Sequence, residues 1–238
     1  MQKISLITGA ARGIGAATAK TLASMGHKVC INYCSNKNIA NLLVKEIKKN
    51  GGDAIAIKAD ITNENDAIQM FKSIINKFGR IDNLINNAGI NGGRFTVEDI
   101  SIAKVRSVFE INIIAIFHCC QLAIGYMKNF GGNIINISSQ ASVFAGNNLT
   151  AYAASKAAVN TFTVALAREV AKYKIRVNAV SPGIINTDMN KDINNEKIFT
   201  LPMQRMGEPS EVANLIAWLL SDCASYISGS IIPITGGR

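Results

Sequence analysis

The stretch that decides the fold is Ile4-Ser5-Leu6-Ile7, followed at once by Thr8-Gly9-Ala10-Ala11-Arg12-Gly13-Ile14-Gly15. The apolar run predicts a buried strand, and the small residues after Gly13 predict a helix. Glycines at such a turn let the backbone approach a pyrophosphate, whose charge a helix N-terminus stabilises. The spacing differs from the G-x-x-x-x-G-K-[ST] loop of ATP- and GTP-binding proteins. Three glycines also suit an ordinary strand-to-helix turn. Whether this turn binds a dinucleotide therefore has to be judged from the rest of the sequence.

The remaining sequence repeats this alternation of strand and helix. Further strands are expected at 28–33, 54–57, 83–85, 133–137, 176–180 and 230–232. One helix is expected to begin at about Gly13, a second to end near Gly51, and others to lie near 64–78, 103–128, 151–173 and 210–220. Strands that are apolar on both faces are typical of a parallel sheet covered by helices on each side. The sequence therefore predicts an α/β protein with a single doubly wound Rossmann domain, residues 1–238, that carries the cofactor and substrate sites. Residues 183–205 are the least regular and are a candidate mobile lid.

Composition excludes several classes of function. The net charge is +9, but the longest basic run is Lys48-Lys49 and aromatic residues make up only 6%, so no nucleic-acid surface is expected. No stretch of about 18 to 20 apolar residues is evident, so we expect no membrane partner and a cytoplasmic location. The five cysteines lack the spacing of metal or disulfide sites, so no metal is predicted.

The end of the second expected strand bears on cofactor choice. It reads Asn32-Tyr33-Cys34-Ser35-Asn36-Lys37, without the carboxylate that holds the ribose hydroxyls in NAD-binding units and repels a 2′-phosphate. Arg12 in the glycine turn, together with Ser35 and Asn36, offers donors for that phosphate. The sequence therefore favours NADP(H).

Four side chains are candidates for catalysis. Tyr152 and Lys156 are four residues apart in a helical stretch, so they share a face, and the ammonium is expected to lower the pKa of the phenol. Ser139 follows the strand at 133–137, where a hydroxyl can bind a carbonyl, although Ser138 could fill the same role. Asn112 lies between isoleucines in an expected helix and needs a polar partner, which also suits a structural amide. A solvated helix edge is the ordinary alternative for the tyrosine and lysine.

In combination, these motifs resemble the short-chain dehydrogenase/reductase family. The matching features are T-G-x-x-x-G-x-G from Thr8, Asn86-Asn87-Ala88-Gly89, Asn112, Ser139, Tyr152-x-x-x-Lys156 and Pro182-Gly183. Within the family, the chain is similar to the branch of 3-oxoacyl-carrier-protein reductases and glucose-1-dehydrogenase-like enzymes. The resemblance implies a seven-stranded parallel sheet with helices on both faces. It also implies a homotetramer, built through the helices near 103–128 and 151–173.

The resemblance further implies roles for individual residues. Tyr152 would donate the proton in carbonyl reduction, Lys156 would lower its pKa and bind the nicotinamide ribose, and Ser139 would orient the carbonyl. Asn112 would hold a water of the proton relay. The implied cofactor-binding residues are Gly9, Ala11, Arg12, Gly13, Ile14, Gly15, Ser35, Asn36, Asp60, Ile61, Asn87, Ala88, Gly89, Tyr152, Lys156, Pro182, Gly183, Ile185 and Thr187.

The expected function is an NADPH-dependent carbonyl reductase or alcohol dehydrogenase acting by hydride transfer on a small or medium ketone, a sugar-like compound or an oxoacyl compound. One alternative is 3-oxoacyl-acyl-carrier-protein reduction in fatty-acid synthesis. Those reductases usually carry an Asn-x-Gly-Gln run before the tyrosine, whereas this chain reads Ala145-Gly146-Asn147-Asn148-Leu149-Thr150, and only Lys128, Lys172 and Lys174 supply charge at the expected docking surface. A non-catalytic dinucleotide-binding regulatory protein is a second alternative. Substrate specificity is expected in Gly92-Gly93-Arg94, in 140–149 and in 183–205.

Overall fold

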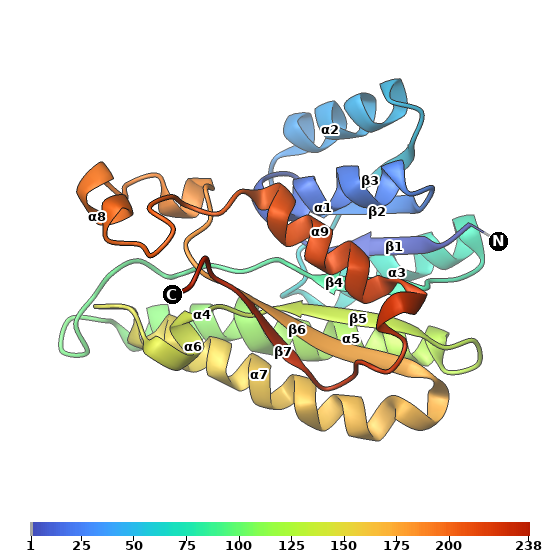
Figure 1. Cartoon of the computed structure of the whole chain (residues 1–238). Coiled ribbons are helices and arrows are strands. Elements are labelled where there is room, and N and C mark those ends of the chain that lie inside the picture. The colour runs from blue at the N-terminus through green and yellow to red at the C-terminus, as the bar shows by residue number, and fades with distance from the viewer. Residues whose placement is uncertain (1) are drawn as a thin grey trace.

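A seven-stranded parallel sheet forms the centre of the protein. The computed structural model describes residues 2–238, apart from the side chains of residues 195 and 197. The strands are β1 (Ile4–Ile7), β2 (Lys28–Tyr33), β3 (Asp53–Lys58), β4 (Asn83–Asn86), β5 (Gly132–Ile137), β6 (Ile175–Pro182) and β7 (Ile231–Ile234). Their order is β3-β2-β1-β4-β5-β6-β7, so the strand order reverses beside β1 (Figure 1). Such a reversal opens a crevice at the carboxyl ends of the strands. The predicted fold class is confirmed.

Helices cover both faces of the sheet (Figure 1). One face carries α1 (Gly13–Ser24), α2 (Lys37–Lys49) and α9 (Pro209–Leu220), and the other carries α3 (Glu64–Phe78), α5 (Ala115–Met127) and α7 (Thr150–Val170). Short helices α4 (Ile102–Phe109), α6 (Ala141–Phe144) and α8 (Asn195–Phe199) lie near the carboxyl edge of the sheet. Leu6 and Ile7, neighbours in β1, are both fully buried, but Leu6 packs with the α3 face and Ile7 with the α1 face. Alternating side chains of one strand thus fill both core layers.

The helix expected near 103–128 is not continuous. A π-helical turn, Glu110–Ile114, separates α4 from α5. Asn112 in this turn is fully buried and bonded to the loop after β4. The wider turn interrupts the regular helix where a polar amide has to reach across to that loop.

The same helical segment bears on the expectation that no stretch crosses a membrane. By length and composition alone, Ile102–Met127 is long and apolar enough to cross a membrane. In the structure, one side of it is buried in the core against the sheet, with Ala115, Ile116 and Cys119 among the buried residues. Core helices of this kind pass the same composition test.

The candidate lid is tied down at both ends. Ile185 pairs with Gly207 in an isolated parallel bridge, and the N–H of Asn186 donates to the Gly207 carbonyl at 2.8 Å. Between these anchors, α8 projects away from the sheet (Figure 1). The segment therefore forms a loop over the carboxyl edge, with fixed ends.

Candidate active site

The glycine turn is pressed against the turn that follows β4. A Cβ on Gly9, whose φ is +59°, would lie 2.9 Å from the Cα of Ala88, and one on Gly15 would lie 2.6 Å from Nδ2 of Asn87. Thr8 joins the two turns, because its Oγ1 accepts from the N–H groups of Asn87 and Ala88 at 3.0 and 3.1 Å. Two of the glycines are thus required by the close approach of these loops.

The N-terminus of α1 is open to an anion. Helix α1 begins at Gly13, no side chain in the described chain caps it, and its first turn holds no acidic residue. The first N–H groups of a helix lack partners within it and carry a partial positive charge. The segment after β6 borders the glycine turn, because a Cβ on Gly13 would lie 3.3 Å from Cγ2 of Thr187. These features fit the pyrophosphate of a dinucleotide.

The predicted 2′-phosphate residues lie at the end of β2 and in the glycine turn. Ser35 and Asn36 are exposed there, whereas Tyr33 is only 7% exposed and packs in the core. Arg12 is also exposed, and its Nη1 lies 3.1 Å from Oδ2 of Asp188, an ion pair that the sequence did not suggest. The guanidinium therefore sits at the glycine turn, as predicted, but is paired with a carboxylate from the lid segment.

Asp60 and Ile61 occupy the turn after β3. Oδ1 of Asp60 accepts from the N–H and hydroxyl of Thr62 at 3.0 and 2.7 Å, and Ile61 is buried. Asp60 therefore shapes a turn at the carboxyl edge, on the far side of β2 from the catalytic candidates.

Helix α7 holds Tyr152 and Lys156 one turn apart. Lys156 is buried, its Nζ donates to the carbonyl of Ile137 at 2.7 Å, and Nζ lies 5.8 Å from the centre of the Tyr152 ring. Because Ile137 ends β5, this bond fixes the lysine against the carboxyl edge of the sheet. The alternative of a solvated helix edge is wrong for this pair.

Ser139, and not Ser138, meets the tyrosine. The side chains of Ser139 and Tyr152 are hydrogen-bonded, and Oγ of Ser139 also accepts from the N–H of Ala141 at 3.1 Å. Ser138 is buried and donates instead to Oδ1 of Asn160 at 2.6 Å. The structure therefore gives Ser138 a packing role and leaves Ser139 beside the phenol.

The pKa values correct one expectation from the sequence. Burial lowers the pKa of Lys156 from 10.5 to about 8. Burial also raises the pKa of Tyr152 above its ordinary value of 10, and the hydrogen bond with Ser139 opposes this rise. The adjacent ammonium was expected to lower the pKa of the phenol, but the loss of hydration dominates here. Tyr152 is therefore protonated at neutral pH, the state that a proton donor needs.

Asn112 links the π-helical turn to the loop after β4 and to α7. Its Oδ1 accepts from the N–H of Ile90 at 2.9 Å, while its Nδ2 donates to the Ile90 carbonyl at 2.9 Å and to Oγ of Ser155 at 3.0 Å. A Cβ on Gly89 would lie 3.0 Å from this Oδ1 and 3.5 Å from Nζ of Lys156. The amide thus has the partners that the sequence required, and both of its hydrogens are used.

Most of the predicted site residues follow the carboxyl ends of strands. Gly9, Ala11, Arg12, Gly13, Ile14 and Gly15 follow β1, Ser35 and Asn36 follow β2, Asp60 and Ile61 follow β3, and Asn87, Ala88 and Gly89 follow β4; Ser139 follows β5, Pro182 ends β6, and Gly183, Ile185 and Thr187 come after it. Tyr152, Lys156 and Asn112 reach the same edge from the helices.

Sequence reasoning missed Asn32, whose Oδ1 accepts from the N–H of Gly9 at 3.1 Å and whose Nδ2 donates to the Ala59 carbonyl at 3.0 Å. An asparagine inside an apolar strand was the available signal.

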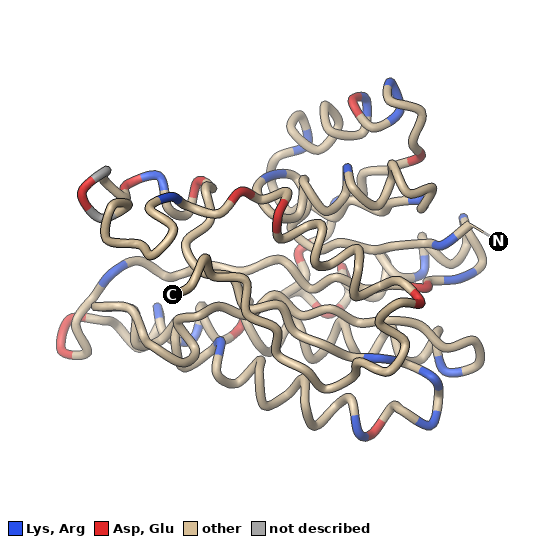
Figure 2. The backbone as a smooth tube through the Cα atoms, in the orientation of Figure 1, with Lys and Arg blue, Asp and Glu red and all other residues tan. Residues whose placement is uncertain are grey.

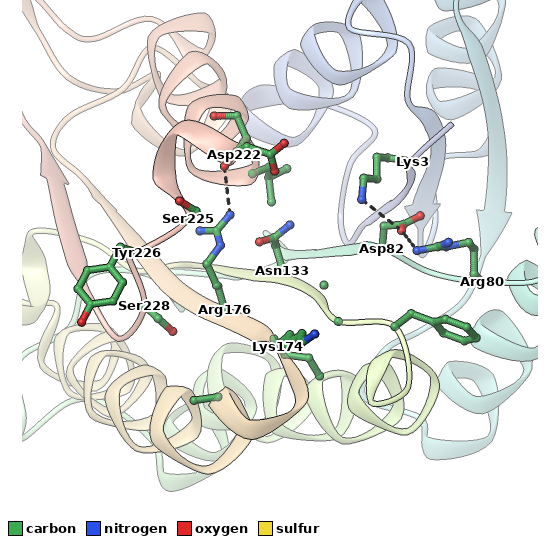
Figure 3. A pocket seen from close by; sticks show the side chains of 17 residues that line it. Lys3, Arg80, Asp82, Asn133, Lys174, Arg176, Asp222, Ser225, Tyr226 and Ser228 are labelled. Carbon is green, nitrogen blue, oxygen red and sulfur yellow. Dashed lines mark hydrogen bonds and ion pairs between the residues drawn. The ribbon is translucent and has the colours of Figure 1, made fainter. Parts of the chain in front are cut away.

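A cavity of about 570 Å³ lies at the opposite, amino edge of the sheet (Figure 3). Lys3 and Arg80 flank Asp82 there, and Arg176 donates to the carbonyls of Ile227 and Leu219. These cations already serve the fold, and none of the predicted site residues lines the cavity. The carboxyl edge remains the candidate active site.

Known proteins match the whole chain. A family model described as enoyl-(acyl carrier protein) reductase matches residues 9–238. The 3-oxoacyl-[acyl-carrier-protein] reductase of Synechocystis sp. is 40% identical over 238 residues, which cover 99% of this chain and 96% of that protein.

Two solved structures are similar in fold and sequence. A 7α-hydroxysteroid dehydrogenase complexed with NADH and 7-oxo glycochenodeoxycholic acid has a TM-score of 0.94 and 37% identity, covering 99% of this chain and 93% of that one. A blue fluorescent protein from a metagenomic library, in complex with NADPH, has a TM-score of 0.92 and 34% identity, covering 99% and 97%. With its seven-stranded sheet and matches of this extent, the chain belongs to the short-chain dehydrogenase/reductase family of oxidoreductases.

Proposed function

We propose that this protein is an NADPH-dependent carbonyl reductase in which Tyr152, Lys156, Ser139 and Asn112 form the active site within one domain. The observation that carries the proposal is the contact of Ser139 with a half-buried, protonated Tyr152, one helical turn from a buried lysine. This group stands at the same sheet edge as the uncapped N-terminus of α1. Bound nicotinamide would supply the hydride, and the chain would supply orientation and a proton.

Each side chain has a part that follows from its contacts. Ser139 donates a hydrogen bond to the substrate oxygen, and Tyr152 gives its phenolic proton to that oxygen as the carbonyl carbon is reduced. Lys156, held by Ile137, stabilises the phenolate left behind and binds the ribose of the cofactor. Asn112 holds Ile90 and Ser155 in place, and the second lone pair of its Oδ1 is available to a relay water.

The choice of NADPH rests on charge. No carboxylate stands among the residues from Tyr33 to Asn36, and Arg12 lies in the glycine turn. A guanidinium binds a phosphate through charge-assisted hydrogen bonds. Since the two structural neighbours hold NADH and NADPH respectively, the argument for NADPH comes from this chain's own residues.

The substrate side of the site supports an apolar substrate. Phe144, in α6, is 64% exposed; Phe199, at the end of α8, is 68% exposed; and Met203, beside the C-terminal Gly236, is 62% exposed. These side chains come from two of the three segments in which the sequence places specificity, 140–149 and 183–205. Large apolar side chains left exposed are typical of a binding surface. An oxoacyl or similarly hydrophobic carbonyl compound therefore fits better than a sugar.

A spectrophotometric assay tests this proposal. The protein is given NADPH with 3-oxoacyl thioesters of increasing chain length, a hydrophobic cyclic ketone and a keto sugar. We expect kcat/KM to rise about three- to fourfold for each added CH₂ until the surface is filled, since one buried CH₂ contributes about 0.8 kcal/mol. Turnover of the keto sugar alone would contradict the apolar substrate. Fluorescence titration that shows NADPH binding without turnover of any carbonyl would favour a non-catalytic binding protein.

Reduction of an acyl group bound to a carrier protein is a second candidate. Figure 2 shows lysine and arginine gathered at the end of the molecule where α5 and α7 end. Lys128, Arg168, Lys172 and Lys174 are exposed there, so the basic surface is larger than the sequence suggested. The Synechocystis relative carries the name of such a reductase. A tenfold or greater preference for the carrier-bound over the coenzyme A-bound thioester, lost in 0.5 M salt, is the expected result for this candidate.

The assembly is proposed to be a homotetramer in the cytoplasm. Ile102, Ile114 and Phe117, on the segment from α4 to α5, are 66%, 54% and 55% exposed. Apolar side chains of this size on one helical segment are typical of a surface that packs against another subunit.

A further inference from the structure

The ion pair between Arg12 and Asp188 connects the glycine turn after β1 to the segment after β6, which both border the proposed cofactor site. Arg12 is the N-cap residue of α1, and Asp188 begins a 3₁₀ turn, Asp188–Asn190, in the segment after β6. Nη1 of the arginine lies 3.1 Å from Oδ2 of the aspartate, and the two side chains are 68% and 70% exposed. The residues are 176 positions apart in the sequence, so only the fold brings them together.

Asp188 is held in this position by its own segment. The N–H of Asn190 donates to the carbonyl of Thr187 at 2.9 Å, and Nδ2 of Asn190 donates to the carbonyl of Ile185 at 2.9 Å. Thr187, the preceding residue, borders the glycine turn at Gly13. The carboxylate is therefore presented to Arg12 by a short, bonded turn, and not by a free chain end.

We propose that Asp188 is a specificity-determining residue that weakens NADPH binding by competing with the 2′-phosphate for Arg12. The inference rests on the proposed function, in which Arg12 binds that phosphate. A guanidinium has a limited set of donors, and a carboxylate and a phosphate oxygen accept from them in the same way. A bound phosphate must displace the carboxylate or share the guanidinium with it. NADH lacks this phosphate, so its affinity does not depend on the competition.

The size of the effect follows from the exposure of the pair. An exposed ion pair shifts an equilibrium by about fivefold at most, and a like charge near the phosphate adds a similar factor. Removing the charge in Asp188→Asn should therefore tighten NADPH binding by about three- to tenfold at low salt. The change should be smaller in 0.5 M salt, because screening weakens exposed charges. NADH binding should change by less than about twofold.

Fluorescence titration of NADPH and NADH without substrate tests the inference on the wild type, Asp188→Asn, Arg12→Ala and the double variant. We expect Asp188→Asn to tighten NADPH selectively, Arg12→Ala to weaken NADPH selectively, and Asp188→Asn to have less than a twofold effect in the Arg12→Ala background. Asp192→Asn is the matched control, because it removes the same charge from the same segment outside the pair, and it should leave both affinities unchanged.

Four results would overturn the inference. Weaker NADPH binding in Asp188→Asn would mean that the carboxylate positions Arg12 for the phosphate. An equal tightening in the presence and absence of Arg12 would mean that Asp188 acts without the arginine. If Arg12→Ala has no selective effect on NADPH, Arg12 is not the phosphate ligand, and the cofactor choice in the proposed function fails with the inference. A selective loss in Arg12→Ala with no change in Asp188→Asn would overturn the inference alone.

Discussion

Replacing the buried lysine with methionine should stabilise the protein while removing its activity. Lys156 is buried, and its pKa is lowered from 10.5 to about 8 by the loss of hydration. At about 1.4 kcal/mol for each pKa unit, keeping the ammonium charged in the folded state at pH 7 costs about 3 kcal/mol. Lys156→Met removes that cost but also the hydrogen bond to the Ile137 carbonyl, which contributes about 1 kcal/mol. The free energy of unfolding at pH 7 should rise by about 2 kcal/mol.

The sign of this effect depends on pH. Because the folded-state pKa lies below the ordinary value, the unfolded chain binds more protons between pH 8 and 10.5, and the stability of the wild type rises over that range. The advantage of Lys156→Met should therefore be complete below pH 8 and disappear as the pH approaches 10.5. Urea unfolding of the cofactor-free protein at pH 7 and pH 10, at one protein concentration, measures this difference. Lys128→Met, at an exposed position, is the control and should change stability by less than about 0.5 kcal/mol. A wild type that is more stable than Lys156→Met at pH 7 would refute the reasoning.

Three further predictions concern the glycine turn, the cofactor and the assembly. Gly9→Ala should lower the free energy of unfolding, measured in urea, by at least about 2 kcal/mol, because the new Cβ would have a positive φ and would lie 2.9 Å from the Cα of Ala88. The control Gly79→Ala, which also has a positive φ but open space around it, should lower it by only about 1 to 2 kcal/mol. Equal losses in the two variants would contradict this prediction. Ser35→Asp should weaken NADPH binding by about tenfold or more and leave NADH binding nearly unchanged in fluorescence titrations, and parallel losses would exclude a phosphate at Ser35. Light scattering should give a mass of four 25.5 kDa chains, and Phe117→Ser should lower it; a monomeric wild type would reject the tetramer.

Much of the fold could be predicted from local pattern. The alternation of apolar runs with helical segments, and the apolar character of both faces of a strand such as β1, are enough to predict a parallel sheet between two helical layers. The interruption at Glu110–Ile114 could not be predicted, because it depends on the distance from Asn112 to Ile90, a residue far away in the sequence.

In the candidate site, too, some features could be predicted from local sequence and others depend on the assembled fold. The spacing of Tyr152 and Lys156 predicts that they share a helix face, and the strand before Ser139 predicts that it lies at the carboxyl edge. The direction of the pKa shift of Tyr152 could not be predicted, because burial is a property of the assembled fold. The ion pair of Arg12 with Asp188 could not be predicted either, because Asp188 lies in a segment without a regular helix or strand pattern.

The most direct test of the proposed mechanism is Tyr152→Phe, which removes one hydroxyl from a side chain of α7 that lies beside Ser139. NADPH-linked turnover and the NADPH dissociation constant are measured side by side on the wild type and the variant. The mechanism predicts that turnover falls by about 10²- to 10⁴-fold or more, while the NADPH dissociation constant changes by less than about twofold. Turnover within tenfold of the wild type would contradict the assignment of Tyr152 as the proton donor.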